Sequence, residues 1–272
     1  MKRWLIALLA LPLSALATER VISIGGDVTQ IVYALGAQQT LVGRDSTSLH
    51  PALATKLPNI GYMRQLNAEG ILALKPTLVL VSELAKPSMA LEQVQQAGVK
   101  VVTVSGKADI KAIDDKITTV AQALQREEAG KSLQQSLDKQ LTALNRQPLP
   151  VKVLFIMAHN GVTTMSAGRG TAADAAIQTA GLQNAMGNVQ RYQPLSQEGV
   201  IASAPQLVVV GEDGLRTLGG KDNLWQLPGL AMTPAGQQHQ LLVVDDMALL
   251  GFGIDTPGAI VKLRKAAEAI AK

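Results

Sequence analysis

Residues 66–81, LNAEGILALKPTLVLV, match residues 195–210, LSQEGVIASAPQLVVV, without a gap. Both stretches share a leading leucine, a Glu-Gly pair, a proline and a final Leu-Val-x-Val run. A helical pattern that ends at a proline and leads into an apolar run is typical of a helix–turn–strand unit. The coincidence of the Glu-Gly pair with the proline spacing argues against chance similarity. The repeat therefore predicts two lobes that contain equivalent units.

Strands and helices alternate on either side of these units. Helical patterns are expected at 28–35, 68–74 and 87–97, and buried strands at 21–24, 41–43, 78–81, 100–104 and 151–156. Short strands that alternate with helices predict parallel sheets covered by helices on both faces. The predicted fold class is α/β, with two lobes that each contain a mostly parallel sheet flanked by helices.

One long helix is expected between the lobes, because apolar residues recur at helical spacing from 109 to 145 with no strand between them. The predicted division is a signal peptide at 1–17, an N-terminal lobe at 18–125, a connecting helix at 126–147 and a C-terminal lobe at 148–272. In paired α/β lobes the ligand cleft lies between the lobes, at the loops that follow the carboxyl ends of the strands. A stiff connector also predicts small lobe movements on ligand binding.

The first residues have the features of a secretory signal peptide. A basic start, Met1-Lys2-Arg3, precedes a short apolar run and a small-x-small site that ends at Ala17. The apolar run is shorter than the roughly 20 residues of a membrane span. A buried N-terminal helix is the alternative. Because the sequence contains no cysteine, it can form neither disulfides nor a lipid-modified cysteine, and we expect a periplasmic protein without a membrane anchor.

Charge and motifs argue against several classes of function. Without Lys2 and Arg3 the formal charge falls from +4 to +2, which argues against nucleic acid or an anionic membrane as a partner. The chain contains no Gly-x-Ser-x-Gly or Gly-x-x-x-x-Gly-Lys motif, so no enzyme activity is predicted. Three scattered histidines predict no dedicated zinc or manganese site, and His50 and His239 are expected to be solvated loop residues.

Residues 61–79, GYMRQLNAEGILALKPTLV, resemble the haem-binding periplasmic proteins of bacterial haem ABC importers. The Glu-x-Ile-x-Ala-Leu-x-Pro-x-Leu-Val pattern within them is shared by the whole helix-bridged class, which also carries siderophores and cobalamin. The resemblance implies capture of haem, ferric protoporphyrin IX, and its delivery to an inner-membrane ABC permease and its ATPase for iron uptake. An outer-membrane haem receptor system is the implied supplier. A ferric-siderophore or cobalamin carrier and a secreted haem-handling enzyme are the alternatives.

In the resembled family a loop tyrosine ligates the haem iron and a nearby arginine supports its phenolate, and these roles fall on Tyr62 and Arg64. A phenol has a reference pKa of about 10, so it needs a neighbouring cation and the ferric iron to bind as phenolate. His159 is a further candidate iron ligand, either as a second axial ligand or for a second haem. The alternative is that it is an ordinary polar residue, and the number of bound haems stays open.

The repeat places further candidates in the second lobe. Tyr62 aligns with Arg191, and Met63 aligns with Tyr192, so the matching loop offers a cation and an aromatic ring to the same cleft. Arg191 or Arg169 can pair with the haem propionates, because a guanidinium binds a carboxylate through charge-assisted hydrogen bonds.

Glu69 and Glu198 occupy the same place early in the helix of each repeat. A carboxylate at that place complements the helix dipole, which is the plain structural explanation. In the resembled class one such glutamate from each lobe docks onto arginines of the permease. We expect this docking role for Glu69 and Glu198.

Overall fold

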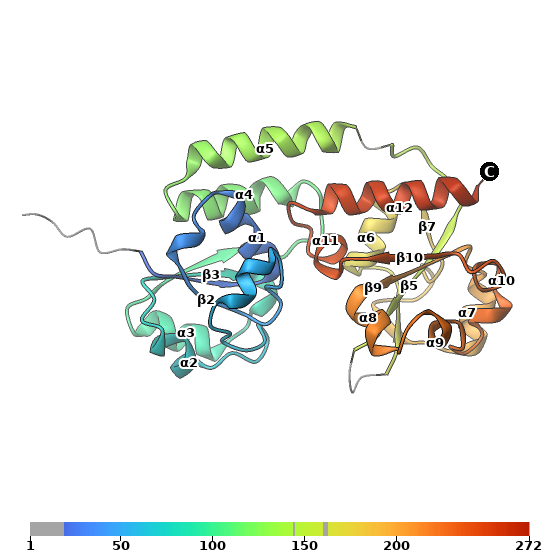
Figure 1. Ribbon diagram of the computed structural model, residues 1–272, viewed down its shortest axis with the longest axis horizontal. Helices are drawn as coiled ribbons and strands as arrows, with labels where there is room; N and C mark the ends of the chain where they lie inside the picture. Colours follow the sequence, from blue (N-terminus) through green and yellow to red (C-terminus); the bar gives the residue numbers. More distant parts are fainter. Residues whose placement is uncertain (1–18, 144, 160–162, 272) are drawn as a thin grey trace, which may run out of the picture.

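The computed structural model describes residues 19–143, 145–159 and 163–271, so the predicted signal peptide at 1–17 lies outside the described residues. Two α/β lobes lie side by side, and helices α5 (Glu127–Thr142) and α12 (Thr256–Ile270) run along one side of the molecule (Figure 1). None of the helices in the described ranges has both the length and the apolar character that crossing a membrane requires.

The N-terminal lobe is built on a parallel sheet in the order β2-β1-β3-β4. The strands are β1 (Val21–Ile24), β2 (Leu41–Arg44), β3 (Leu78–Ser82) and β4 (Lys100–Val104). β1 and β3 are buried along their whole length, which fits a parallel sheet that lies between two layers of helices.

Helices cover both faces of this sheet. The helices are α1 (Gly26–Ala34), α2 (Ala68–Ala73), α3 (Met89–Gln96) and α4 (Ala112–Ala123), with short 3-10 helices η1 (Gln38–Thr40), η2 (Ala52–Lys56) and η3 (Glu83–Ala85). On one face α1, α4 and α5 pack with Val21 and Leu80 of the sheet. On the other face α2 and α3 pack with Ile24 and Val79. The two apolar layers explain why the strands lack an alternating polar pattern.

The C-terminal lobe contains a mixed sheet in the order β10-β9-β5-β6-β8, and β7 pairs with the start of β5. The strands are β5 (Lys152–Met157), β6 (Met165–Ala167), β7 (Gln183–Asn184), β8 (Tyr192–Pro194), β9 (Leu207–Gly211) and β10 (Leu241–Val244). β5, β9 and β10 are parallel, whereas β6 and β8 are antiparallel. The parallel centre agrees with the predicted fold class, and the antiparallel strands extend one edge.

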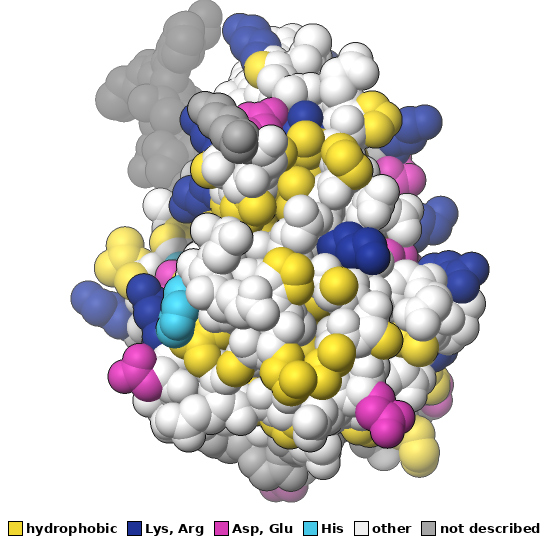
Figure 2. Space-filling view, turned by 90° about the vertical axis from the view of Figure 1, so that its right-hand side faces the viewer, with side chains coloured by type: hydrophobic (Ala, Val, Ile, Leu, Met, Phe, Trp, Pro, Cys, Tyr) yellow, Lys and Arg dark blue, Asp and Glu magenta, His cyan; other side chains and the backbone are white. Residues whose placement is uncertain are grey.

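Helices also cover both faces of the second sheet. The elements are α6 (Ala172–Thr179), α7 (Gln197–Ser203), α8 (Glu212–Thr217), α9 (Lys221–Trp225), η4 (Leu230–Met232), α10 (Pro234–Gln237) and α11 (Asp246–Leu250). α6, α11 and α12 pack with Phe155 and Val209 on one face, and α7, α9 and α10 pack with Leu154 and Val208 on the other. Seen from the end of the molecule that this lobe forms, acidic and basic side chains are interspersed among apolar ones (Figure 2).

The two repeated stretches fold into the same unit, as predicted. Asn67 and Ser196 cap α2 and α7, and each side-chain oxygen accepts a hydrogen bond from the backbone N–H three residues later. Lys75 and Ala204, which directly precede the prolines, both adopt a left-handed conformation with φ of 48° and 44°. Each unit then enters an interior strand of its sheet, β3 or β9.

The helix between the lobes is shorter than the predicted range 126–147, because α5 ends at Thr142. Beyond this point Arg146 donates a hydrogen bond to the carbonyl oxygen of Leu141, and the side chain of Asn145 accepts one from the backbone two residues later. These local hydrogen bonds compete with the continued helix. α5 packs along α4 and also contacts α12 of the other lobe.

Candidate functional site

The carboxyl edges of the two sheets face each other, because β1 leads toward the second lobe and β10 leads back toward the first (Figure 1). Contacts between the loops at these edges connect the lobes. His50 Nε2 lies 2.6 Å from Asp245 Oδ2, and Gln30 Nε2 donates a hydrogen bond of 2.9 Å to Asp255 Oδ2. The structure therefore brings together the edges at which the sequence predicts ligand binding.

A tight turn presents Tyr62 at the N-terminal edge. Gly61 adopts a φ of +97°, which favours glycine, and Gln65 donates its backbone N–H to the Tyr62 carbonyl oxygen over 2.8 Å. Met63 points into the core of the lobe and is 8% exposed, whereas Tyr62 is 44% exposed. The buried methionine anchors the turn and leaves Tyr62 and Arg64, which is also exposed, available to a ligand.

A buried carboxylate organises the loops beside this turn. Asp45 is fully buried and accepts hydrogen bonds from the Gly25 N–H at 2.9 Å and from the Ser48 hydroxyl at 2.7 Å. It also accepts hydrogen bonds from the backbone and the hydroxyl of Thr47. Ser46, within the same loop, donates its N–H to the carbonyl oxygen of Gly61. Asp45 thus ties the loops after β1 and β2 to the tyrosine turn.

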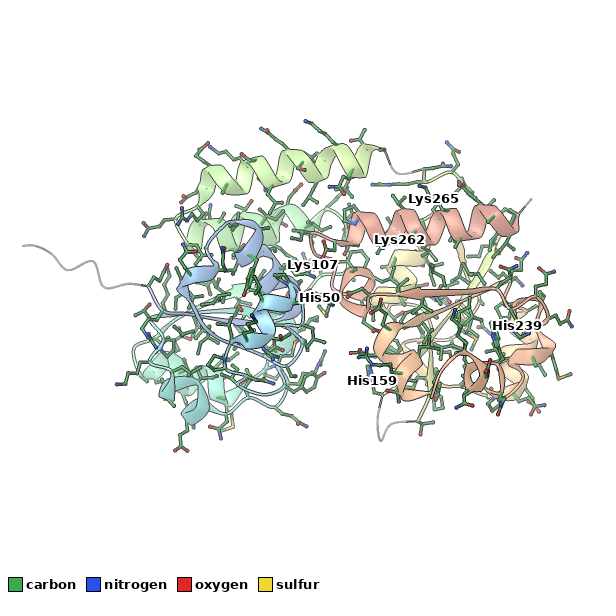
Figure 3. All side chains as sticks on the ribbon, in the orientation of Figure 1. His50, Lys107, His159, His239, Lys262 and Lys265 are labelled. Carbon is green, nitrogen blue, oxygen red and sulfur yellow. The ribbon has the colours of Figure 1, made fainter. Side chains whose placement is uncertain are left out.

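His159 lies at the facing edge of the C-terminal lobe. It follows β5, is exposed, and lies on the side of this lobe that is turned toward the N-terminal lobe (Figure 3). Burial raises the pKa of the Asp246 carboxyl, and the charge of His159 acts in the opposite direction. Burial and the Asp246 charge together raise the pKa of Tyr192 to about 12. Tyr192 is therefore a neutral phenol at physiological pH and a hydrogen-bond donor.

The predicted arginines lie together just beyond the far end of the antiparallel β6–β8 pair. Arg191 donates its backbone N–H to the carbonyl oxygen of Arg169 over 2.9 Å, and both side chains are exposed. Met165, at the other end of β6, pairs with Met157 close to His159. Arg169 stands four residues further along the chain, about 13 Å in extended backbone. Tyr192 pairs with Ala167, so its backbone lies at the arginine end of β8, while the Asp246 charge raises the pKa of its side chain.

The two glutamates occupy equivalent exposed positions. Glu69 and Glu198 both lie in the first turn of a helix, α2 and α7 respectively. α2 and α7 cover the sheet faces opposite to those covered by α4 and α12. Each lobe therefore presents one negative side chain on the same side of the fold.

His50 and His239 are exposed loop residues, as expected, and each also has a partner. His50 contacts Asp245 across the lobes, as described above. The His239 ring packs edge-on against Trp225, with ring centroids 5.1 Å apart. The two α/β lobes bring these loops onto partners that are distant in sequence, which a local pattern does not reveal.

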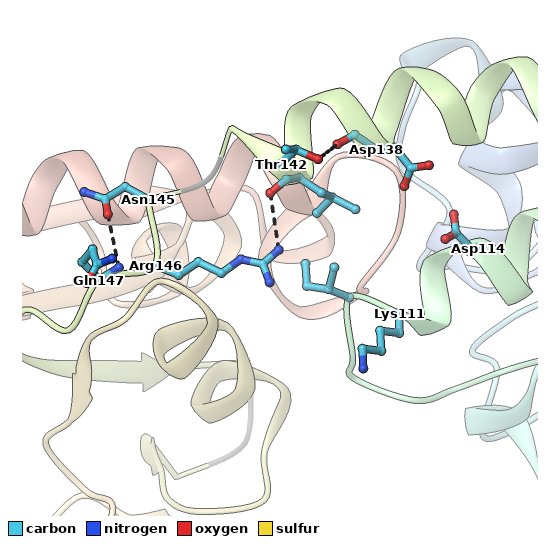
Figure 4. Close-up of a pocket in the computed structure, with 9 residues that line it drawn as sticks. Lys111, Asp114, Asp138, Thr142, Asn145, Arg146 and Gln147 are labelled. Atoms are coloured by element: carbon cyan, nitrogen blue, oxygen red, sulfur yellow. Dashed lines mark hydrogen bonds between the residues drawn. The ribbon is translucent and has the colours of Figure 1, made fainter.

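A cavity of about 670 Å³ lies between α4, α5 and the segment after α5 (Figure 4). Its lining is Ile110, Lys111, Asp114, Asp138, Leu141, Thr142, Asn145, Arg146 and Gln147. Burial and the charges of Asp138 and Asp115 raise the pKa of Asp114. Because the connector forms its walls, this cavity is separate from the facing edges that carry Tyr62 and His159.

Residues 21–248 match the sequence model of a family described as periplasmic binding protein. The chain belongs to the periplasmic binding protein family. This periplasmic binding protein is similar in structure to the periplasmic heme-binding protein RhuT from Roseiflexus sp. RS-1 in apo form. The two are 39% identical, with a TM-score of 0.89 and with 94% of this chain and 100% of RhuT covered.

Two further relatives differ in what they are described to bind. The periplasmic heme-binding protein BhuT, solved in complex with two hemes, is 39% identical with a TM-score of 0.87, and the match covers 93% of this chain and 99% of BhuT. A vitamin B12-binding protein of Vibrio vulnificus (strain YJ016) is 28% identical over 218 residues, 79% of each chain. This periplasmic binding protein thus has greater identity to the two heme-binding relatives than to the vitamin B12 binder.

Sequence reasoning missed the buried polar groups that position the site of this periplasmic binding protein. Asp45 carried a usable signal, because an aspartate followed by hydroxyl residues is typical of a turn. Lys116 also carried one, since it falls at helical spacing between Ile113 and Val120, on the apolar face of α4. Asp246 carried none, because its partners come from distant parts of the chain.

Proposed function

We propose that this protein captures haem in the periplasm and delivers it to an ABC permease of the inner membrane. The observation that carries the proposal is the exposed Tyr62, presented by a turn with a buried anchor at the carboxyl edge of the first lobe. The 39% identity to RhuT and BhuT, both described as heme-binding, supports haem as the ligand.

Tyr62 ligates the ferric iron as a phenolate in this proposal, and Arg64 in the same turn offsets the negative charge. His159 approaches from the other lobe. It ligates the same iron on its other side or the iron of a second haem, and the two-heme complex of BhuT supports the second arrangement. The Tyr192 phenol contributes a neutral hydrogen bond to the same space, and the propionates pair with Arg169 or Arg191.

Delivery requires a loaded carrier to dock on the permease. Glu69 and Glu198 supply one negatively charged docking residue on each lobe, and these two residues bind a permease whose ATPase drives import. The signal peptide at 1–17 directs secretion, and an outer-membrane haem receptor system supplies the cargo. The protein itself has no catalytic role in this proposal.

Cobalamin is the second candidate, because the vitamin B12-binding relatives share the family. The residue that separates the two candidates is Tyr62. A haem depends on an iron ligand from the protein, whereas replacing Tyr62 leaves cobalamin or ferric-siderophore binding largely intact.

The test is an absorbance titration of the purified mature protein with ferric haem, beside Tyr62→Phe. The expected result is a saturable Soret shift with tyrosinate charge-transfer bands, which Tyr62→Phe lacks. Tyr33→Phe removes the hydroxyl of another tyrosine, on α1, and is expected to behave as wild type. Saturable binding of cyanocobalamin without a specific haem spectrum would overturn the proposal.

A further inference from the structure

Helix α8 depends on a side chain from another helix to complete its first turn. Its N-cap residue, Gly211, has no side chain, so it cannot supply the usual capping oxygen. The carboxylate of Asp246, the first residue of α11, lies at this N-terminus, where a hydrogen bond with the Asp213 backbone acts to lower its pKa. The Asp246 carboxylate occupies the space where a Cβ of Gly211 would be. Asp246 thus takes the place of a local cap.

α8 in turn supports the backbone that leads to His159. Gly214 lies in the first turn of α8 and is buried. A Cβ on Gly214 would stand 3.4 Å from the carbonyl oxygen of Ala158 and 3.6 Å from its nitrogen. The helix therefore packs directly against the residue before His159, so a shift of the first turn of α8 would move the histidine.

The charges of Asp246 and His159 also interact. Burial raises the pKa of Asp246 most, the charges of Asp213 and Asp245 raise it further, and the charge of His159 lowers it. A carboxylate near a metal-ligating histidine is a common way to fix the orientation of the ring.

The helix that carries Asp246 is also held by the other lobe. Asp245 caps α11 by accepting a 2.7 Å hydrogen bond from the Ala248 N–H, and it contacts His50 of the N-terminal lobe. The Met247 side chain packs against Gly26, where a Cβ would stand 3.0 Å from the methionine Cε. Both lobes therefore fix the place of Asp246.

We propose that Asp246 is a positioning residue for haem ligation: by capping α8, which packs against Ala158, it holds the His159 imidazole toward the iron without touching the haem itself. This inference rests on the proposed haem binding and adds a requirement to it. Without Asp246, Tyr62 still ligates, but His159 no longer does.

The experiment compares haem-loaded wild type with Asp246→Ala, Asp246→Asn and His159→Ala by electron paramagnetic resonance and near-infrared magnetic circular dichroism, which report histidine coordination. Asp246→Ala is expected to reproduce the spectrum of His159→Ala while it keeps the tyrosinate bands of Tyr62. Its haem affinity should fall by about 10- to 100-fold, as for other carboxylates that support a metal ligand. Asp246→Asn keeps a capping oxygen and should restore part of the histidine signal.

Two further variants separate positioning from general damage. Gly211→Ala leaves Asp246 intact but displaces its carboxylate, so it should resemble Asp246→Ala. Asp222→Ala removes an exposed carboxylate from the first turn of α9 and should match wild type. Far-ultraviolet circular dichroism of each apo protein checks folding, and Asp246→Asn and Gly211→Ala keep the test valid if Asp246→Ala does not fold.

The outcomes distinguish this inference from the proposed function. A wild-type histidine signal in both Asp246→Ala and Gly211→Ala would overturn the positioning role and leave haem binding intact. A His159→Ala spectrum identical to wild type would do the same, since it would mean that His159 is not a ligand. Absence of any specific haem spectrum in the wild type would overturn the proposed function itself.

Discussion

Lys116 and Asp27 form a buried ion pair at the junction of the two lobes, with 2.7 Å between Lys116 Nζ and Asp27 Oδ2. Their side chains are 1% and 6% exposed. The same ammonium group donates a 2.8 Å hydrogen bond to the carbonyl oxygen of Gly251, which precedes α12. One lysine thus satisfies a carboxylate of its own lobe and a backbone carbonyl of the other lobe.

Lys116→Met is expected to destabilise the protein strongly. It leaves Asp27 buried without a counter-charge, and breaking a buried pair in this way costs about 3–5 kcal/mol of the free energy of unfolding. Urea denaturation followed by circular dichroism measures this loss. Lys131→Met, which breaks the exposed pair with Glu128, is the control and should leave stability unchanged. Equal effects of the two variants would show that the buried pair contributes nothing.

The lobes are expected to move little when the ligand binds. The Lys116 hydrogen bond to Gly251, the His50–Asp245 contact and the Gln30–Asp255 hydrogen bond all cross between them, and α5 contacts α12. Small-angle X-ray scattering should give the same radius of gyration for the apo and the haem-loaded protein within error. Substantial compaction on loading would contradict this, and Lys116→Met should increase any difference because it removes one crossing contact.

The parts of the fold that could be predicted are those that local patterns encode. The repeat at 66–81 and 195–210 contains its own caps, its own proline and its own strand, so both copies fold as predicted. Strands β6 and β8 have three residues each, too few for a periodic signal, and their antiparallel pairing depends on tertiary contacts. The end of α5 was misplaced because local hydrogen bonds beyond Thr142 replace the helix before the prolines.

The candidate site also has a part that local sequence encodes and a part that depends on tertiary contacts. The tyrosine turn is local, so Tyr62 and Arg64 could be singled out from a short stretch of sequence. Asp246 could not, because α8 and the contact of its neighbour Asp245 with the other lobe come together only in the folded protein. Buried polar groups whose partners are far apart in sequence leave no spacing to detect, although they decide where the exposed groups point.

Tyr192 is expected to keep its proton well into the alkaline range. Burial and the nearby Asp246 charge raise its pKa from the ordinary value of about 10 to about 12. An ultraviolet absorbance titration of tyrosinate should therefore lose its component near pH 12 in Tyr192→Phe. A loss near pH 10 instead would show that Tyr192 is not held neutral.

The same shift predicts how stability depends on pH. Below pH 10 the phenol is protonated in both the folded and the unfolded state, so its contribution is constant. Between about pH 10 and 12 the unfolded state releases this proton first, and the free energy of unfolding falls as pH rises. Chemical denaturation at several pH values should show a steeper fall in wild type than in Tyr192→Phe over this window.

Charge reversal of Glu69 and Glu198 tests whether these two glutamates dock on the permease. Both residues are exposed and lie in the first turn of equivalent helices, on the faces away from α4 and α12. Glu69→Lys with Glu198→Lys should therefore leave the haem spectrum and affinity unchanged. Stimulation of the cognate ATPase by the loaded protein, measured with the permease in proteoliposomes, should be lost, and each single variant should retain part of it.

A second double substitution at other exposed acids tests whether the effect is specific to Glu69 and Glu198. Glu92→Lys and Asp222→Lys reverse one exposed acid in each lobe, in the first turns of α3 and α9, and change the net charge by the same amount. If docking depends on Glu69 and Glu198, this control variant retains ATPase stimulation. Equal loss in both double variants would mean that overall charge governs the encounter, since long-range attraction does not distinguish one exposed carboxylate from another.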